Sequence, residues 1–164
     1  MQVLGNRQIV QKVKRLAIQI LERNYTEQEI ILAGINKNGV VFAQLLLNEL
    51  VTMSNKSFIL TRIKINPANP IANEIEIELP LESLNGKNII VIDDVANTGR
   101  TLFYAVKPLM TILPNKIETA VLVDRKHKSF PIDVSYYGIS LATTFQENIK
   151  VRLVEEGNFE VNLS

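Results

Sequence analysis

The chain has 164 residues, no cysteine and a formal net charge of +1. This length suits one domain whose core needs no cross-links, and the lack of cysteine excludes a disulfide framework and a cysteine-based zinc site. The near-neutral charge gives no reason to expect attraction of the whole molecule to nucleic acid, so such binding would need a local patch. The sequence shows neither a signal peptide nor an apolar run long enough to span a membrane, so we expect a cytoplasmic protein without membrane attachment.

Apolar residues near the N-terminus recur at helical spacing and predict a first helix that ends near Asn24. These residues are Ile9, Val13, Leu16, Ala17, Ile20 and Leu21. The opposite face is basic, which is typical of a solvated helix face, with an interaction surface as the alternative. Its basic residues are Lys12, Lys14, Arg15 and Arg23. Residues 29–34 predict the first central strand, and residues 40–51 predict an apolar helix.

Short apolar or alternating runs predict six further strands. They cover residues 57–65, 74–79, 88–92, 116–123, 133–139 and 150–156. Residues 66–73 (NPANPIAN) contain two prolines and three asparagines, so they are neither helix nor central strand. Another helix is expected from about Arg100 to about Leu113.

The alternation of strands and helices with short connections predicts a doubly wound, mostly parallel sheet flanked by helices. We expect a single domain over residues 1–164. Within it, residues 1–28 would form an N-terminal helix, residues 29–145 the core, and residues 146–164 a C-terminal strand and tail.

The most informative segment is residues 88–101, NIIVIDDVANTGRT. It places Asp93 and Asp94 at the carboxyl end of a strand, where ligands bind in open α/β sheets. Two carboxylates there can accept hydrogen bonds from the vicinal hydroxyls of a ribose, with or without Mg²⁺ nearby. A capped helix after a buried strand is the structural alternative, but it gives no reason for two adjacent aspartates.

The residues that follow suit a phosphate. Thr98 and Thr101 offer hydroxyls, and Gly99 lets the backbone approach an anion closely. The expected helix start adds backbone amides, and Arg100 adds a fixed positive charge.

The run VIDDVANTGRT resembles the phosphoribosyl-pyrophosphate (PRPP) motif of the type I phosphoribosyltransferases. The resemblance implies the fold of that family, with Asp93 and Asp94 holding the 2- and 3-hydroxyls of the ribose. It also implies a loop that binds the 5-phosphate. This loop consists of Ala96, Asn97, Thr98, Gly99, Arg100 and Thr101. In relatives that act on 6-oxopurines, an aspartate before the TG pair handles a proton on the ring; Asn97 cannot, which disfavours hypoxanthine and guanine.

Residues 34–39, GINKNG, follow the first central strand, and in the family this turn binds pyrophosphate. A diphosphate needs backbone amides and a basic side chain, which here is Lys37. We expect the glycines and asparagines to tolerate unusual backbone dihedrals in such a loop. The predicted contacts are Asn36, Lys37, Asn38 and Gly39. An ordinary strand-to-helix loop with a solvated lysine is the alternative.

Residues 120–138 and the ISLATT that follows resemble one subfamily, the bifunctional pyrimidine operon attenuator and uracil phosphoribosyltransferase. Its features are the VDR-x-H run, a proline with isoleucine, and an aromatic-glycine step. A uracil pocket needs an apolar wall and backbone groups, which residues 139–143 can supply. The resemblance implies a base pocket of Asp124, Arg125, Ile139, Ser140 and Leu141. His127 is the only histidine, and we assign it an ancillary role.

In the family, a mobile lid closes over the substrates in the region of residues 61–79 and excludes water. Here the region is short and rich in asparagine and proline, with only Arg62, Lys64 and Glu74 charged near the linker. The usual charges of the lid are therefore missing, which puts turnover in more doubt than PRPP binding.

The leading hypothesis is Mg²⁺-dependent transfer of the phosphoribosyl group from PRPP to a nucleobase, with uracil as the expected base. The alternative is a regulatory protein of the same fold that senses PRPP or nucleotide, binds RNA, and has little or no catalysis. RNA would need a basic surface, formed on the homodimer or higher oligomer that the subfamily suggests. Its expected residues are Lys12, Arg15, Arg125, Lys126 and Lys128. A purely structural α/β domain is the third reading.

Overall fold

The computed structural model describes residues 1–142, 147–153 and 158–164. Its helices are α1 (Asn6–Arg23), α2 (Asn36–Met53) and α3 (Arg100–Ala105), with 3₁₀ helices η1 (Leu81–Leu84) and η2 (Lys107–Thr111). The strands of the larger sheet are β2 (Glu29–Ile35), β3 (Ser57–Lys64), β4 (Glu76–Ile77), β5 (Asn88–Ala96), β6 (Lys116–Arg125) and β7 (Tyr136–Leu141). Those of the smaller sheet are β1 (Gln2–Leu4), β8 (Ile149–Arg152) and β9 (Glu160–Leu163).

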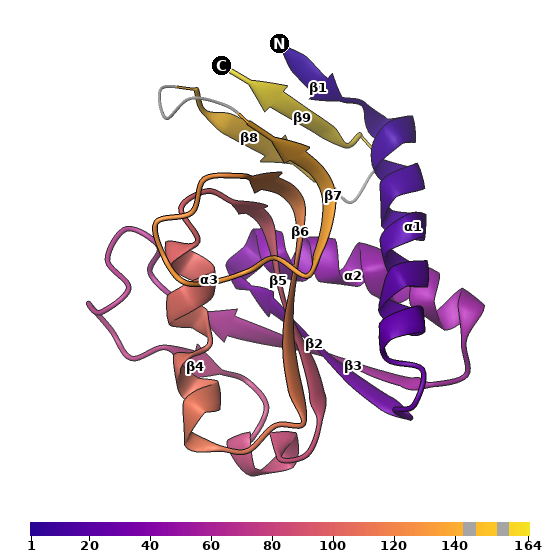
Figure 1. The fold of residues 1–164 in the computed structure, drawn as a ribbon, viewed down its shortest axis with the longest axis vertical. Helices are drawn as coiled ribbons and strands as arrows, with labels where there is room; N and C mark the ends of the chain where they lie inside the picture. Colours follow the sequence, from indigo (N-terminus) through magenta and orange to yellow (C-terminus); the bar gives the residue numbers. More distant parts are fainter. Residues whose placement is uncertain (143–146, 154–157) are drawn as a thin grey trace.

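In the described part of the chain, the larger sheet has the strand order β4-β3-β2-β5-β6-β7 (Figure 1). Every neighbouring pair in it is parallel except β3 and β4. The chain moves outward from β2 to β3 and then crosses to the other side of β2 to form β5. The direction of winding therefore reverses between β2 and β5, and the carboxyl ends of such a pair form the crevice in which open α/β sheets bind ligands.

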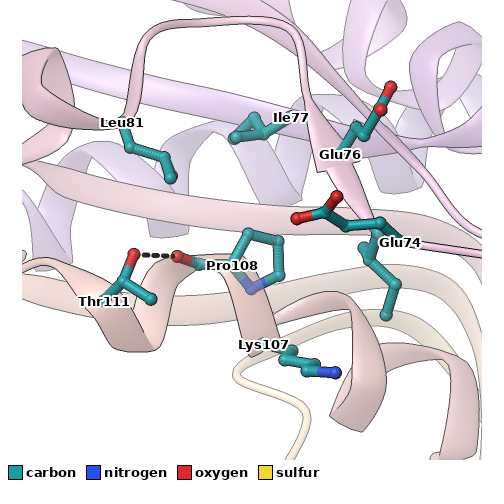
Figure 2. A pocket seen from close by; sticks show the side chains of 8 residues that line it. Glu74, Glu76, Ile77, Leu81, Lys107, Pro108 and Thr111 are labelled. Atoms are coloured by element: carbon teal, nitrogen blue, oxygen red, sulfur yellow. Dashed lines mark hydrogen bonds between the residues drawn. The ribbon is translucent and has the colours of Figure 1, made fainter. Parts of the chain in front are cut away.

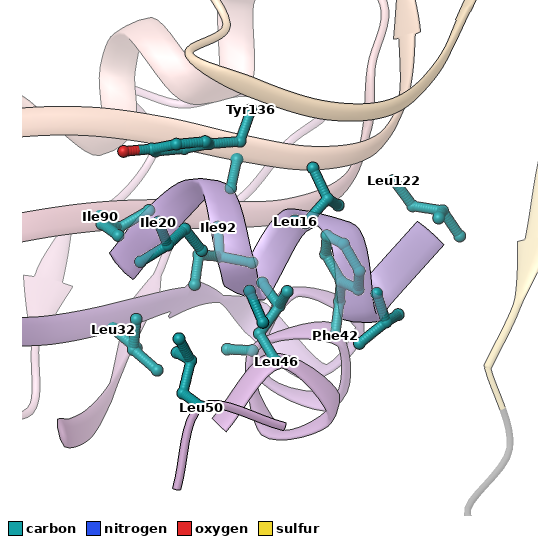
Figure 3. Packing of buried hydrophobic residues seen from close by; sticks show 14 of the residues in the cluster. Leu16, Ile20, Leu32, Phe42, Leu46, Leu50, Ile90, Ile92, Leu122 and Tyr136 are labelled. Atoms are coloured by element: carbon teal, nitrogen blue, oxygen red, sulfur yellow. The ribbon is translucent and has the colours of Figure 1, made fainter. Parts of the chain in front are cut away.

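The central strands are apolar on both faces because each face packs against helices. Ile30 and Leu32 of β2 face the side covered by α1 and α2, whereas Ile31 and Ala33 face the side covered by α3 and η2. Figure 3 shows the first side, where α1 and α2 pack against strand residues. Its labelled residues are Leu16, Ile20, Leu32, Phe42, Leu46, Leu50, Ile90, Ile92, Leu122 and Tyr136. The predicted doubly wound, mostly parallel sheet is confirmed.

A polar network joins the end of α1 to the amino ends of the strands. Asn24 Nδ2 donates to Ile20 O (2.8 Å) and lies 3.2 Å from both Glu118 Oε1 and Tyr136 Oη. Asn88 Nδ2 donates to Asn24 Oδ1 at 2.7 Å, and Tyr136 Oη donates to Glu118 Oε1 at 2.8 Å. Because Asn24 and Asn88 are buried, these bonds satisfy groups that would otherwise be costly to remove from water.

Several element boundaries differ from the sequence predictions. The motif strand does not stop before the aspartates, because β5 continues in register with β6 to Ala96. The following helix ends at Ala105 and is continued by η2, since Pro108 has no N–H to donate to Tyr104. The strand predicted over residues 74–79 shrinks to the two residues of β4, and the one predicted over residues 133–139 begins only at Tyr136.

The largest difference from the predictions lies at the two ends of the chain. β1 and β9 were not predicted, and with β8 they form an antiparallel sheet in which Met1 N donates to Leu163 O at 2.7 Å. Both termini therefore lie side by side next to β7 and β8 (Figure 1). Residues 154–156 of the strand predicted over 150–156 lie outside the described residues. No helix in the described ranges is long and apolar enough to cross a membrane.

Candidate functional site

Asp93 and Asp94 lie near the carboxyl end of β5, beside the reversal point of the sheet. Each carboxylate accepts a hydrogen bond from the backbone N–H of the next residue, at 2.9 Å for Asp93 Oδ1 and 2.8 Å for Asp94 Oδ1. Both side chains are thereby held on the strand end and keep further lone pairs for a ligand. The structure thus brings the two predicted ribose-binding residues together at the crevice.

The pKa of Asp93 is raised well above its ordinary value of 3.8. Burial is the largest cause, followed by the charge of Asp94 and a side-chain hydrogen bond with Asp94; the backbone N–H of Asp94 acts in the opposite direction. Two carboxylates this close resist double ionisation. A ligand that supplies hydroxyl donors or a cation would relieve this repulsion, which makes the pair a ready binding site for either.

The first turn of α2 faces this pair from across the reversal point. Asn38 Nδ2 donates to Asp94 Oδ2 at 3.1 Å, so a side chain of the predicted pyrophosphate turn touches a predicted ribose-binding acid. Asn36 points the other way, because its Nδ2 donates to Ile65 O at 2.9 Å and its Oδ1 accepts from Ile65 N at 3.0 Å. Lys37 is exposed at the same turn.

The glycines of this turn have a different role from the one predicted. The residue with a left-handed backbone is Asn36 (φ 52°), and neither Gly34 nor Gly39 has a positive φ. A Cβ on Gly34 would lie 2.6 Å from Val40 Cα, and one on Gly39 would lie 2.5 Å from Ile92 O. The glycines therefore let α2 begin directly against the ends of β2 and β5, and the expected loop is a helical turn.

The predicted phosphate loop lines a small hollow of about 60 Å³. Gly99 has φ 86°, and a Cβ there would lie 2.5 Å from Ile132 Cγ2, so glycine is required for two reasons. The carbonyl of Thr98 accepts from Ser129 N (2.9 Å) and Phe130 N (3.3 Å), so the loop is fixed to residues 129–130. All six predicted residues of the loop lie in one place. The hollow is lined by Val95, Ala96, Asn97, Thr98, Gly99, Arg100, Thr101 and Leu102.

Arg100 also reaches the segment predicted as a lid. Its Nη2 donates to Pro67 O at 2.6 Å and lies 3.5 Å from Ala68 O. The segment borders a hollow of about 530 Å³ whose lining includes Asn36, Lys64 and Glu74. Lys64 is therefore beside the site, whereas Arg62 is half-buried and lies two residues earlier on β3.

The predicted base pocket is brought together only in part. Asp124 pairs in register with Ser140, and Arg125 with Leu141, so these residues share one edge of the sheet. The Asp124 carboxylate is paired with Lys128 Nζ, and Arg125 is buried with its Nη2 donating to Glu147 O at 2.6 Å. Thr143, the last residue of the predicted stretch 139–143, lies outside the described residues.

Ile139 faces a different hollow. It lines a space of about 550 Å³ together with residues of β1 and α1, among them Lys12 and Arg15. Arg125 is buried and Lys128 is paired with Asp124, so two members of the expected basic surface are engaged inside the fold. Lys12, Arg15 and Lys126 remain accessible, and His127 is exposed.

Another hollow, of about 440 Å³, lies apart from these loops (Figure 2). Glu74, Glu76 and Ile77 line it from the β4 side, opposite Pro108 and Thr111 of η2. Its lining contains no residue of β5 or the phosphate loop, so we do not assign it to the site.

Sequence reasoning missed three contacts that organise the site. They are the Asn38–Asp94 hydrogen bond, the reach of Arg100 to Pro67, and the pairing of Lys128 with Asp124. Each joins segments that the local pattern treats separately, apart from the i,i+4 spacing of Lys128 and Asp124, which was a usable signal. Across the part of the chain that the structure describes, no three acidic or histidine side chains form a metal site on their own.

Comparisons with known proteins agree with this geometry. The sequence model described as "Phosphoribosyl transferase domain" matches residues 1–156. The chain is 32% identical over 154 residues to the "Bifunctional protein PyrR" of Streptococcus thermophilus, covering 92% of this chain and 89% of that protein. It is also 32% identical over 164 residues to the protein of the same name from Streptomyces coelicolor, covering 94% and 83%.

Solved structures show the same fold. The hypoxanthine phosphoribosyltransferase of Trypanosoma cruzi aligns with a TM-score of 0.77 and 17% identity, covering 99% of this chain and 95% of that one. A hypoxanthine-guanine phosphoribosyltransferase from Bacillus anthracis aligns with a TM-score of 0.74 and 22% identity, covering 88% and 85%. These identities support the fold alone, whereas the family match and the relatives above 30% identity cover nearly the whole chain. The chain belongs to the phosphoribosyltransferase family.

Proposed function

We propose that the protein transfers the 5-phosphoribosyl group from PRPP to a nucleobase, with uracil as the preferred base. The observation that carries this proposal is the meeting of two loops at the reversal point of the sheet, where Asn38 of the α2 turn donates to Asp94 of β5. A single ligand with a diphosphate and a ribose can contact both loops at once. PRPP is such a ligand, and it is the donor used throughout the family that the sequence motif resembles.

Different residues of the site would bind different parts of PRPP. The backbone amides of the phosphate loop and the hydroxyls of Thr98 and Thr101 would bind the 5-phosphate, which would occupy the small hollow that this loop lines. Asp93 and Asp94 would accept hydrogen bonds from the ribose hydroxyls. Lys37 and the amides of the α2 turn would bind the diphosphate.

Mg²⁺ fits this site as part of the substrate complex. Asp93 and Asp94 are oxygen donors of the kind that Mg²⁺ prefers, but two carboxylates are too few to form a complete octahedral shell. The diphosphate and water would supply the other ligands. When bound, Mg²⁺ would neutralise the charge that develops on the departing diphosphate.

The chain itself would act by positioning and electrostatics. As the diphosphate leaves, positive charge develops on the ribosyl carbon, and a ribose held by Asp93 and Asp94 would have their negative charge beside it. A nitrogen of the base attacks the same carbon from the opposite face. No covalent enzyme intermediate is needed, so the lack of cysteine is no obstacle.

The choice of uracil is supported by Asn97 and by the late segment of the sequence. Asn97 is exposed at the phosphate loop and has a carboxamide where a 6-oxopurine enzyme needs a carboxylate. The edge formed by Asp124, Ser140 and Leu141 offers backbone groups that can pair with a pyrimidine.

Pyrophosphate release from PRPP and Mg²⁺ tests the proposal. We expect release with uracil and little with orotate, hypoxanthine, guanine, adenine or no base. Asp94→Asn should abolish release, whereas Glu22→Gln, which changes an exposed carboxylate of α1 near the amino ends of the strands, should not. Release with a purine alone would overturn the uracil assignment, and no release with any base would overturn the proposed transfer.

A second function, RNA binding by a regulatory protein, is favoured by the hollow beside α1. Lys12 and Arg15 line it together, and the pKa of Lys12 is lowered first by burial and then by the charge of Arg15. Two cations held this close would gain from a phosphate between them. Saturable binding of a structured RNA that weakens steeply with salt and is lost in Lys12→Gln would support this function. Sedimentation of the same samples would test whether the binding form is the expected homodimer.

A further inference from the structure

Residues 66–73 are held by the buried Pro70 and by a charged side chain from outside the segment. This segment contains no charged residue, yet it lies against the phosphate loop. The contact is made by Arg100 Nη2, which donates to Pro67 O at 2.6 Å and approaches Ala68 O to 3.5 Å. A guanidinium that binds backbone carbonyls needs no particular side chain in its partner.

The turn in the segment is built to present these carbonyls. Asn66 Oδ1 accepts from the backbone N–H of Ala68 (3.1 Å) and of Asn69 (3.3 Å). Side-chain turns of this kind fix the backbone locally and leave the intervening carbonyls to point outward. Pro67 also restricts the unbound chain, which lowers the entropy lost when the segment docks.

The residue just before the segment is fixed as well. Asn36 makes two hydrogen bonds with the backbone of Ile65, at 2.9 and 3.0 Å. The start of the segment is thus tied to the α2 turn through Ile65 and, two residues later, to the phosphate loop through Pro67. These are the two loops that would bind the diphosphate and the 5-phosphate.

We propose that Arg100 is a positioning residue that holds the 66–73 segment closed over the site through the carbonyls of Pro67 and Ala68. The catalytic consequence rests on the proposed function, but the closure itself does not. Arg100 then replaces the charges that this segment lacks. Substrate bound at the phosphate loop would be covered by a segment anchored on that same loop, and water would be excluded from the reacting carbon.

Hydrogen exchange of the ligand-free protein tests the closure without requiring activity. The reporter is the Ala72 N–H, which bonds to Asn69 O at 3.0 Å and keeps its acceptor in every variant. Arg100→Gln and Asn66→Ala should each speed its exchange roughly fivefold, as expected for losing hydrogen bonds at a partly exposed site. Lys107→Gln removes an exposed cation close to the same helix and should leave the exchange unchanged.

The double variant shows whether the two residues act through one contact. If they do, the exchange in Arg100→Gln/Asn66→Ala should match the faster single variant. Fully multiplied effects would overturn a shared contact. Unchanged exchange in Arg100→Gln would overturn the proposal outright.

Kinetics and PRPP affinity separate positioning from direct phosphate binding. Positioning predicts that Arg100→Gln lowers kcat roughly tenfold and increases base-independent PRPP hydrolysis, while the Kd of PRPP changes less than threefold. A direct phosphate contact predicts the reverse: weaker PRPP binding that Arg100→Lys restores, with normal exchange. If no base supports pyrophosphate release but the exchange rises as stated, the closure stands and the proposed transfer fails.

Discussion

Asn38 Nδ2 donates to Asp94 Oδ2 at 3.1 Å, and this bond spans the gap between the carboxyl ends of β2 and β5. It orients one carboxylate of the pair from a separate element. We predict that Asn38→Ala lowers kcat/KM for PRPP roughly five- to tenfold, because Asp94 then loses the hydrogen bond that orients its carboxylate from the α2 turn. Asn38→Asp should cost more, since it adds a third carboxylate to the site. Steady-state kinetics with varied PRPP measures both.

The matched control is Asn158→Ala, which removes an exposed carboxamide at the start of the C-terminal strand region. Its kcat/KM should equal that of the original protein. If Asn38→Ala behaved like this control, the hydrogen bond would have no part in substrate binding or turnover.

The raised pKa of Asp93 predicts a pH-dependent stability. The unfolded carboxyl ionises near 3.8, whereas the folded one keeps its proton to higher pH. Between these values the folded state binds more protons than the unfolded state, so the stability of the protein falls as pH rises through this window. We predict that Asp93→Asn raises Tm at pH 7 by roughly 2–4 °C and raises it much less at pH 4. The same variant should lose pyrophosphate release.

Differential scanning calorimetry at both pH values checks this prediction. Glu22→Gln serves as the control, since Glu22 is exposed on α1 near the amino ends of the strands, opposite the end that holds Asp93. An equal change in Tm at pH 4 and pH 7 for Asp93→Asn would mean that the carboxyl does not titrate differently in the folded state.

Local patterns were sufficient for the fold class and the motif. The apolar run before Asp93 predicts a strand buried on both faces, and the turn after it predicts a helix start at Arg100; both are confirmed. The predicted phosphoribosyltransferase resemblance is confirmed by the family match over residues 1–156. These features depend on neighbours in sequence, which is why sequence alone could identify them.

Features that depend on contacts between distant segments could not be predicted from local sequence patterns. β1 and β9 have three and four residues, too few to show a period, and they exist only because the two chain ends pair. The predicted roles of Gly34 and Gly39 were wrong, because the close approach of α2 to Ile92 produces no recognisable pattern in the neighbouring sequence. The partner of Arg100 lies 33 residues away at Pro67, beyond the reach of any local pattern.

The close approach at Gly39 predicts a large cost for adding one methyl group. A Cβ there would meet the Ile92 carbonyl at 2.5 Å, and both atoms belong to rigid backbone. We predict that Gly39→Ala lowers the free energy of unfolding by about 2–4 kcal/mol and weakens PRPP binding, because the α2 turn must move away from β5. Urea unfolding and PRPP titration measure the two effects.

Gly86→Ala is the informative comparison. Gly86 has φ 72° but nothing within 4 Å of an added Cβ, so only backbone strain of about 1 kcal/mol is expected, with PRPP binding unchanged. Equal losses of stability in the two variants would show that close packing at Gly39 is not what fixes the α2 turn.

The polar network at the amino ends of the strands predicts a loss of stability that leaves the site intact. Asn24→Ala removes the acceptor of Asn88 Nδ2 (2.7 Å) and a donor near Tyr136 Oη (3.2 Å) in a buried place. We expect the free energy of unfolding to fall by about 2–4 kcal/mol, since buried groups lose their partners. Tyr136→Phe should cost less, because it removes one hydroxyl and leaves the hydrogen bond between Asn24 and Asn88 in place. Tyr25→Phe, at a side chain that is 74% exposed, should cost nothing measurable.

The network lies at the opposite ends of the strands from Asp93, so PRPP affinity should be the same in all three variants at temperatures where they are folded. A selective loss of affinity in Asn24→Ala would show that the two ends of the sheet are coupled.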